Sequence, residues 1–195
     1  MRLLLALAIL ALTSTLSFAH TGFTHAAGFF HGFEHPLGGI DHVLAMIAVG
    51  VFAYVLGGRA QWLVPLSFIG MMVAGFALGI AQLDMPFVEL GIAMSSIAIG
   101  TAAAFGRPMP IAIAMALVGA FATFHGHAHG AEMPAALNAL PYATGFVFAT
   151  ALLHATGIGA AFGLSRATGK YGRILARFAG AVFALGGVGL LAGWL

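Results

Sequence analysis

The chain has 195 residues, of which 62% are hydrophobic and only 6% are charged, and its mean hydropathy is +1.07. These values exclude a soluble globular fold and predict one all-α domain, a polytopic bundle of membrane-spanning helices. The net charge of +2 rests on only seven Lys and Arg residues, which argues against a nucleic-acid partner, and the absence of cysteine excludes disulfides and thiolate metal sites.

Residues 1–19 have the pattern of a secretory signal peptide. Arg2 precedes an apolar run, and Ser17 and Ala19 occupy the two small-residue positions that a signal peptidase reads. Cleavage would leave residues 20–195 as the mature membrane domain. Its first residue, His20, could then chelate a divalent metal with its α-amino group and imidazole. The alternative is an uncleaved first helix, which adds a span without changing the orientation of the rest.

Six further apolar stretches each approach the roughly 20 residues that a helix needs to cross about 30 Å of hydrocarbon. They are Gly39–Leu56, Gln61–Leu83, Val88–Phe105, Met109–Phe124, Ala139–Leu164 and Ile174–Leu195. Because the connections between them are short, we expect an antiparallel bundle in which consecutive helices are neighbours.

The charged residues predict how this bundle is oriented. The basic residues follow the first, third and fifth spans, as Arg59, Arg107, Arg166, Lys170 and Arg173, whereas the acidic residues Asp84, Glu89 and Glu132 lie at the opposite ends. By the positive-inside rule, the connections that follow odd-numbered spans are cytoplasmic. We therefore expect a bacterial inner-membrane protein with both mature termini in the periplasm.

The first of two histidine-rich strings, FHGFEHPLGGIDH, occupies residues 30–42 and leads into the first span. Pro36 suits an early helical position, which predicts an extended or capping conformation for His35 and a string that is part loop and part helix. The two glycines that follow permit a tight approach. Asp41 and His42 can both bind one ion, or His42 can bind it while Asp41 orients the ring.

The second string, FHGHAHGAE, occupies residues 124–132. His125 and His129 are four residues apart and Glu132 is three further on, so a helix that continues past the fourth span would align these three side chains along one face. His127 would then point elsewhere.

The predicted topology brings the two strings to the same membrane face. A shared site built from His35, Asp41, His42, His129 and Glu132 is sterically reasonable, and Glu89 at the start of the third span could join it. For Glu89, compensation of the helix dipole is an equally good explanation. The remaining histidines of this region are expected to form a capture zone outside the site: His20, His25, His31, His125 and His127.

Other conspicuous residues have a structural interpretation. His154, alone in the fifth span, is interpreted as a hydrogen-bonded packing residue. The glycine-rich segments Gly70–Gly75 and Gly157–Gly163 are interpreted as faces where helix backbones approach closely.

The two short strings hold six of the nine histidines, and His20 and His25 come shortly before the first string. This density, with carboxylates at ligand-compatible offsets, favours a metal-binding function. Imidazole suits Ni, Cu, Zn and Co, and a site without sulfur argues against Cu(I). Mixed nitrogen and oxygen ligands with room for water fit Ni(II) or Co(II), and this chemistry also accommodates Zn(II).

HPLGGIDH at residues 35–42, together with FHGHAHGAE at residues 124–132, resembles the paired signatures of the HupE/UreJ family. These hydrogenase- and urease-accessory membrane proteins are regarded as nickel permeases, with cobalt as a related substrate. The resemblance covers essentially the whole chain. It implies the following transport-critical residues: His35, Asp41, His42, Glu89, His129 and Glu132, with Phe68 as a matching aromatic residue in the second span. It also implies hydrogenase or urease maturation proteins as partners.

The sequence thus predicts a permease, not an enzyme, that captures hydrated Ni(II) at the periplasmic face and passes it inward between the helices. No prosthetic group is expected, since the metal is the cargo. Two alternatives stay open. A membrane metalloenzyme could hold zinc on His125, His129 and Glu132, although no HExxH string is present. A metal sensor or accessory protein could bind at the outer face without transporting.

Overall fold

The computed structural model describes residues 23–194, and every regular element in that range is helical. Seven α-helices and one 3-10 turn follow in chain order: α2 (Phe23–Gly38), α3 (Ile40–Leu56), α4 (Ala60–Ile80), α5 (Val88–Phe105), α6 (Ile111–Ala131), α7 (Ala139–Thr168), η1 (Gly169–Tyr171) and α8 (Gly172–Leu191). The expected signal peptide and His20 lie outside the described residues. The predicted all-α membrane bundle is confirmed.

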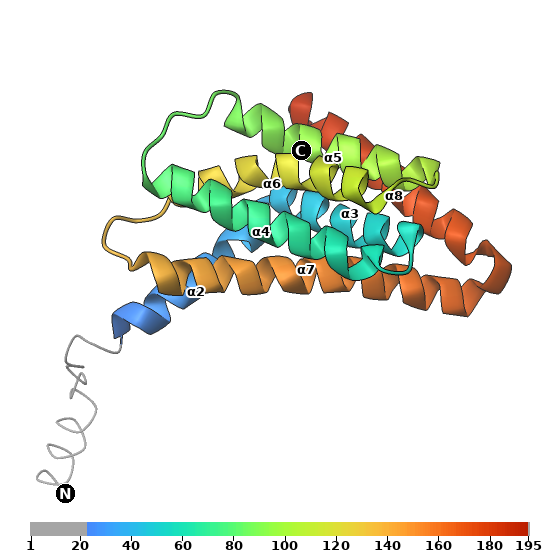
Figure 1. Ribbon diagram of the computed structural model, residues 1–195, viewed down its shortest axis with the longest axis horizontal. Coiled ribbons are helices and arrows are strands. Elements are labelled where there is room, and N and C mark those ends of the chain that lie inside the picture. The colour runs from blue at the N-terminus through green and yellow to red at the C-terminus, as the bar shows by residue number, and fades with distance from the viewer. Residues whose placement is uncertain (1–22, 195) are drawn as a thin grey trace, which may run out of the picture.

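The six spans expected from the sequence correspond to α3 through α8. Most ends differ by four residues or fewer, but α6 continues to Ala131, beyond the expected end at Phe124. By length and apolar composition, four helical stretches can cross a membrane, or five if α2 and α3 count as one bent span. The longest of these stretches, Ala139–Leu191, contains both α7 and α8, which run in opposite directions on either side of η1 (Figure 1).

Helix α2 corrects the expectation that the first string is partly a loop. The string is helical through Gly38, and Pro36 lies in the last turn of α2, so His35 is helical and neither extended nor capping. The reason is tertiary packing, because α2 lies against α7. A Cβ added at Gly32 would collide with the carbonyl oxygen of Tyr142, and one added at Gly145 would collide with that of Phe29. This close contact favours a helix that the local sequence does not predict.

The remaining helices pack chiefly as α4 on α6, α5 on α8 and α3 on α7, so, contrary to the expectation from the sequence, the main partners are not consecutive in the chain. Of these pairs, only α5 and α8 run antiparallel, whereas α4 and α6 run parallel, since Gly75 meets Thr123 and Gly79 meets His127. In Figure 1 the α4–α5 and α6–α7 connections lie at one end of the bundle, together with α2, whereas the turn between α7 and α8 lies at the other end. Small residues set the closest approaches. Gly75 faces the carbonyl oxygen of Thr123, and Gly126 faces that of Met72, so α4 and α6 touch backbone to backbone.

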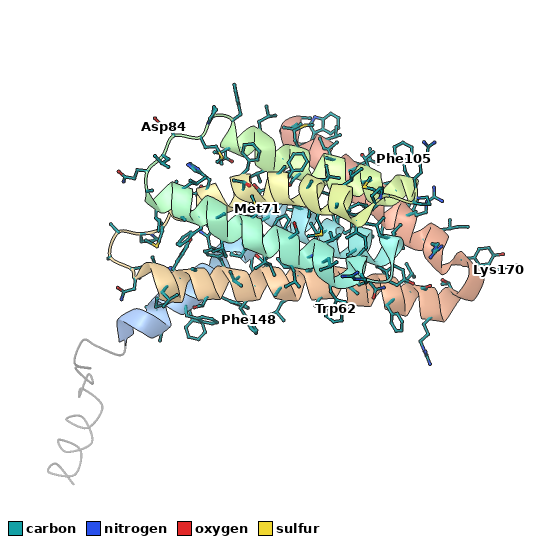
Figure 2. The ribbon with its side chains drawn as sticks, in the orientation of Figure 1. Trp62, Met71, Asp84, Phe105, Phe148 and Lys170 are labelled. Atoms are coloured by element: carbon teal, nitrogen blue, oxygen red, sulfur yellow. The ribbon has the colours of Figure 1, made fainter. Side chains whose placement is uncertain are left out.

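The outer surface of the bundle is apolar, as expected for contact with lipid. Large hydrophobic side chains are exposed on several helices, and Figure 2 shows Trp62, Met71 and Phe148 projecting outward. The largest fully buried side chains include Tyr142, Phe52, Phe68 and Phe146, together with three histidines. Buried imidazoles in such an interior require an explanation.

Candidate metal site

The junction between α2 and α3 positions the first histidine motif. The two helices are bent by 84° at Gly39, whose backbone is extended with φ −104° and ψ 118°. This bend brings His35, at the end of α2, to a ring-centroid distance of 6.3 Å from His42 at the start of α3. A regular helix through the motif is therefore not what brings these two residues together.

Asp41 holds the ring of His42. Its Oδ1 atom accepts a hydrogen bond from the backbone N–H of His42 at 2.8 Å and lies 3.0 Å from Nδ1 of the same residue. This contact leaves Nε2 as the free ring nitrogen, and Nε2 is buried without a hydrogen-bond partner in the described part of the chain. This geometry matches a role for Asp41 in orienting the ring of His42, and not a role as a direct ligand of the ion.

Helix α6 contributes the second motif. It continues to Ala131 and not to Phe124, so His125, His127 and His129 are all helical. His125 and His129 are fully buried, and their rings lie 4.7 Å and 5.0 Å from the ring of His42. The ring of His129 also lies 4.9 Å from that of His35. We call these four residues, His35, His42, His125 and His129, the histidine cluster.

Several ring nitrogens of the histidine cluster have no partner. These are Nε2 of His42, Nδ1 of His125 and both nitrogens of His129, counted against residues 23–194. The other ring nitrogen of His125, Nε2, forms a hydrogen bond of 3.0 Å with the hydroxyl group of Ser95 on α5. A buried polar group left without a hydrogen bond costs about 1–3 kcal/mol, so this arrangement reduces the stability of the fold. Such groups are instead typical of a site that takes up a ligand.

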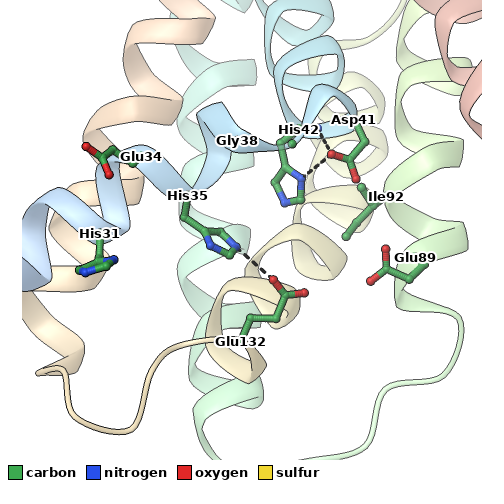
Figure 3. Close-up of a pocket in the computed structure, with 10 residues that line it drawn as sticks. His31, Glu34, His35, Gly38, Asp41, His42, Glu89, Ile92 and Glu132 are labelled. Carbon is green, nitrogen blue, oxygen red and sulfur yellow. Dashed lines mark hydrogen bonds and ion pairs between the residues drawn. The ribbon is translucent and has the colours of Figure 1, made fainter. Parts of the chain in front are cut away.

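An open pocket of about 510 Å³ leads to the cluster from the end of the bundle that carries α2 (Figure 3). Its acidic lining residues are Glu34, Asp41, Glu89 and Glu132, and no Lys or Arg of residues 23–194 lines it. Nε2 of His35 lies 3.3 Å from Oε2 of Glu132, which links the two motifs directly. In Figure 3 Glu89 approaches from α5, on the side of the pocket opposite to His35.

The donor set fits a divalent transition metal, since it combines neutral imidazole nitrogens with carboxylate oxygens. As the side chains stand, no group of three or more His, Asp or Glu residues among those described is arranged to hold an ion. Binding at this position would therefore require side-chain rotation, for example opening of the contact between His35 and Glu132.

The six residues expected to share a site do surround one pocket and its floor: His35, Asp41, His42, Glu89, His129 and Glu132. His31 lies at the exposed rim, where a capture residue was expected. His20 and the side chain of His25 fall outside the described residues.

Two histidines do not lie in the expected capture zone. His125 is buried on the inner side of His42, because the α6 helix turns it toward α3 and α5 and not toward the pocket mouth. His127 points away from the cluster, as its spacing predicted, and its Nε2 lies 2.8 Å from the carbonyl oxygen of Leu83 in the α4–α5 connection. Its position is thus structural.

Three further residues were not assigned to the site by the sequence. Glu34 lines the pocket, and its rarity as one of five acidic residues in the chain could have drawn attention to it. Ser95 supports His125, in a span with few polar residues. His154 was expected to be hydrogen-bonded, but neither of its ring nitrogens has a partner in residues 23–194.

Comparison with known proteins gives two matches. The family model described as HupE / UreJ protein matches residues 7–190. A protein of Rhizobium leguminosarum bv. viciae described as "Protein HupE" is 46% identical over 187 residues, which cover 96% of this chain and 95% of that protein. No solved structure matches the chain. Both histidine strings and all of helices α2 to α7 fall inside the region that the family model matches.

Proposed function

Because the chain belongs to the HupE/UreJ family, we propose that it is a permease that carries Ni(II), with Co(II) as a related substrate, across the inner membrane. In this proposal the ion moves from the periplasm to the cytoplasm and supplies the maturation of hydrogenase or urease. The protein performs no catalysis, and the metal is its cargo.

The observation that carries this proposal is the histidine cluster beneath an acidic pocket. Four imidazoles lie within ring distances of 4.7 to 6.3 Å of their neighbours, and several of their nitrogens are buried without partners. Neutral imidazole is a good ligand for Ni(II) and Co(II), and free ring nitrogens inside an apolar bundle have no other evident use.

Capture of the ion is an electrostatic step. A pocket that is lined by four carboxylates and, among the described residues, by no Lys or Arg raises the local concentration of cations at its mouth. The hydrated ion can exchange water for an oxygen of Glu132 or Glu89 before it reaches nitrogen ligands. His42 is already oriented by Asp41, so little ordering of that ring remains to be done when the ion arrives.

Release requires that the site does not hold the ion too tightly. The existing contact between His35 and Glu132 competes with the metal for both side chains, and this competition weakens binding. Mixed ligation by imidazole and carboxylate therefore supports a site from which the ion can move on.

The direction of transport is inferred from charge. The end of the bundle opposite to the pocket carries basic residues in its connections and adjoining helix ends: Arg59, Arg107, Arg166, Lys170 and Arg173. By the positive-inside rule that end faces the cytoplasm, which leaves the pocket open to the periplasm.

Uptake of radiolabelled nickel into proteoliposomes tests the proposal. We expect wild-type protein to take up nickel faster than protein-free vesicles. His42→Ala and Glu132→Ala should each lower the rate by about tenfold or more, since each removes a ligand or its immediate support. Thr156→Val is the matched control, because Thr156 is exposed on α7 and donates its hydroxyl hydrogen bond to the carbonyl oxygen of Leu152 in its own helix.

Wild-type uptake no faster than that of empty vesicles would refute the permease. If equilibrium dialysis then showed nickel binding to the wild type, a sensor or accessory role would replace transport. If it showed neither binding nor uptake, the metalloenzyme alternative would regain support.

A further inference from the structure

A second set of buried polar side chains lies beyond the histidine cluster, toward the middle of the bundle. Its central member is His154 on α7, which is 2% exposed. Neither of its ring nitrogens has a hydrogen-bond partner among the described residues. A packing role does not explain this histidine, since leucine or phenylalanine would fill the same space without burying two polar atoms.

The backbone around His154 is tightly fixed. A Cβ added at Gly50 on α3 would collide with the carbonyl oxygen of His154, and one added at Gly157 would collide with that of Ile47. The imidazole therefore projects from the closest crossing of α3 and α7. Its position is built into the fold.

The ring of Phe68 separates His154 from the histidine cluster. Its centroid lies 5.5 Å from that of His125 and 5.1 Å from that of His154, and Phe68 is fully buried. The three rings come from α6, α4 and α7, so they form a short path across the interior of the bundle. An ion that leaves His125 would meet Phe68 next and His154 after it.

One hydroxyl group and two thioether sulfur atoms, which are possible metal ligands, lie within one helical turn of His154 or Phe68 or in contact with such a residue. Thr150, one helical turn before His154, directs its hydroxyl group toward the sulfur atoms of Met46 at 3.3 Å and Met72 at 3.7 Å. Met72 in turn follows Phe68 by one turn of α4. All three side chains are fully buried. Thioether sulfur, hydroxyl oxygen and imidazole nitrogen are all groups that a borderline transition-metal ion accepts.

We propose that His154, with Met46, Met72 and Thr150, forms an inner station for the transported divalent ion. Met72 and Thr150 lie on the side of the station that faces the histidine cluster, and His154 lies one helical turn deeper, beside the ring of Phe68. This inference rests on the proposed permease function. The chain's five carboxylates are Glu34, Asp41, Asp84, Glu89 and Glu132, and all belong to the pocket end of the bundle. The inner station thus has only neutral donors. Neutral donors hold a divalent ion weakly, and weak holding suits a site of passage.

The test separates binding at the cluster from passage through the interior. We compare His154→Leu and His154→Gln with wild type, with His42→Ala as the variant of the histidine cluster and Thr156→Val as the control on α7. Each is measured for nickel uptake into proteoliposomes, for nickel affinity of the purified protein by equilibrium dialysis, and for thermal unfolding midpoint.

We expect His154→Leu to unfold at the same temperature as wild type or higher and to keep the nickel affinity within about twofold, while uptake falls by about tenfold or more. His154→Gln, which retains a polar donor, should take up nickel at an intermediate rate. His42→Ala should lose both affinity and uptake.

His154→Leu with uptake within about twofold of wild type would overturn the inner station. If His154→Leu does not fold, nickel uptake by His154→Gln is the test. Uptake by His154→Gln at the wild-type rate would then overturn the proposed inner station. Failure of the proposed function itself looks different, because the wild type would then show no uptake above empty vesicles.

Discussion

At the scale of single residues, Asp41 has the most sharply defined role in the candidate site. Its carboxylate contacts both the backbone N–H and the ring Nδ1 of His42, and it also lines the pocket. The two contacts fix the ring so that Nε2 is the nitrogen available to an ion. Adjacent Asp and His residues in a sequence are compatible with joint ligation as well, and only the geometry distinguishes the two roles.

Asp41→Asn should weaken nickel binding by roughly 10 to 100-fold, the range measured when a residue that orients a metal-binding histidine is altered. The amide keeps the volume of Asp41 but loses the negative charge that holds the Nδ1 proton. Equilibrium dialysis of purified protein measures the affinity, and proteoliposome uptake should fall in parallel.

Asp84→Asn is the matched control for this variant. Asp84 carries the same charge at the same end of the bundle, in the α4–α5 connection, but it does not line the pocket. Its replacement should leave affinity unchanged. Equal losses for Asp41→Asn and Asp84→Asn would mean that only overall charge matters and that His42 does not depend on Asp41.

At the scale of elements, the structure separates what a sequence can predict from what it cannot. The spans α3 to α8 were predictable because their apolar length is set by the bilayer, a constraint that each span meets on its own. Helix α2 was not, because its helical state depends on close packing of Gly32 and Gly145 between α2 and α7. The depth of His125 was missed for a related reason. Spacing places it on a face of α6, but the packing of α3 decides whether that face points outward or inward.

The bend between α2 and α3 leads to a prediction about Gly39. A Cβ at this position would lie 2.5 Å from Oδ1 of Asp41 and 3.2 Å from Nδ1 of His42, although its backbone conformation suits any residue. Gly39→Ala should therefore displace the Asp41 carboxylate and reduce nickel uptake by about tenfold, with little change in stability.

Gly38→Ala is a control one residue away, because a Cβ at Gly38 meets nothing within 4 Å. Uptake by this variant should match wild type. Since the two substitutions are chemically identical and adjacent, an equal loss of uptake in both would contradict the displacement of Asp41 and point to a general effect on the hinge.

Helix packing can be tested inside one of the glycine-rich segments that the sequence singled out. Of its two end residues, Gly75 meets the backbone of Thr123, whereas Gly70 faces open space. Gly75→Ala should destabilise the bundle by about 1–3 kcal/mol through overpacking. Gly70→Ala should leave stability unchanged or slightly improved. Unfolding in a denaturing detergent measures both, and equal stability of the two variants would show that the α4–α6 crossing is not limited by backbone contact.

At the scale of the whole molecule, charge and metal donors are divided between the two ends of the bundle. The acidic residues and the histidine cluster occupy the end with α2, and the basic connections occupy the other. In the proposed function, this division orients the protein in the membrane and places the acidic pocket on the periplasmic side, from which we propose that the metal arrives. On this proposal, one arrangement of charge serves both insertion and capture.

The orientation can be measured directly because the chain has no cysteine, so a single introduced thiol is the only one present. Ala135 in the α6–α7 connection and Lys170 in η1 are both exposed and belong to opposite ends of the bundle. With the outer membrane permeabilised, a membrane-impermeant maleimide should label Ala135→Cys in intact cells and should label Lys170→Cys only after the inner membrane is opened. Retained nickel uptake shows that each variant is folded. Labelling of Lys170→Cys but not of Ala135→Cys in intact cells would contradict the proposed orientation. The pocket would then face the cytoplasm, and the protein would bind its ion for export and not for uptake.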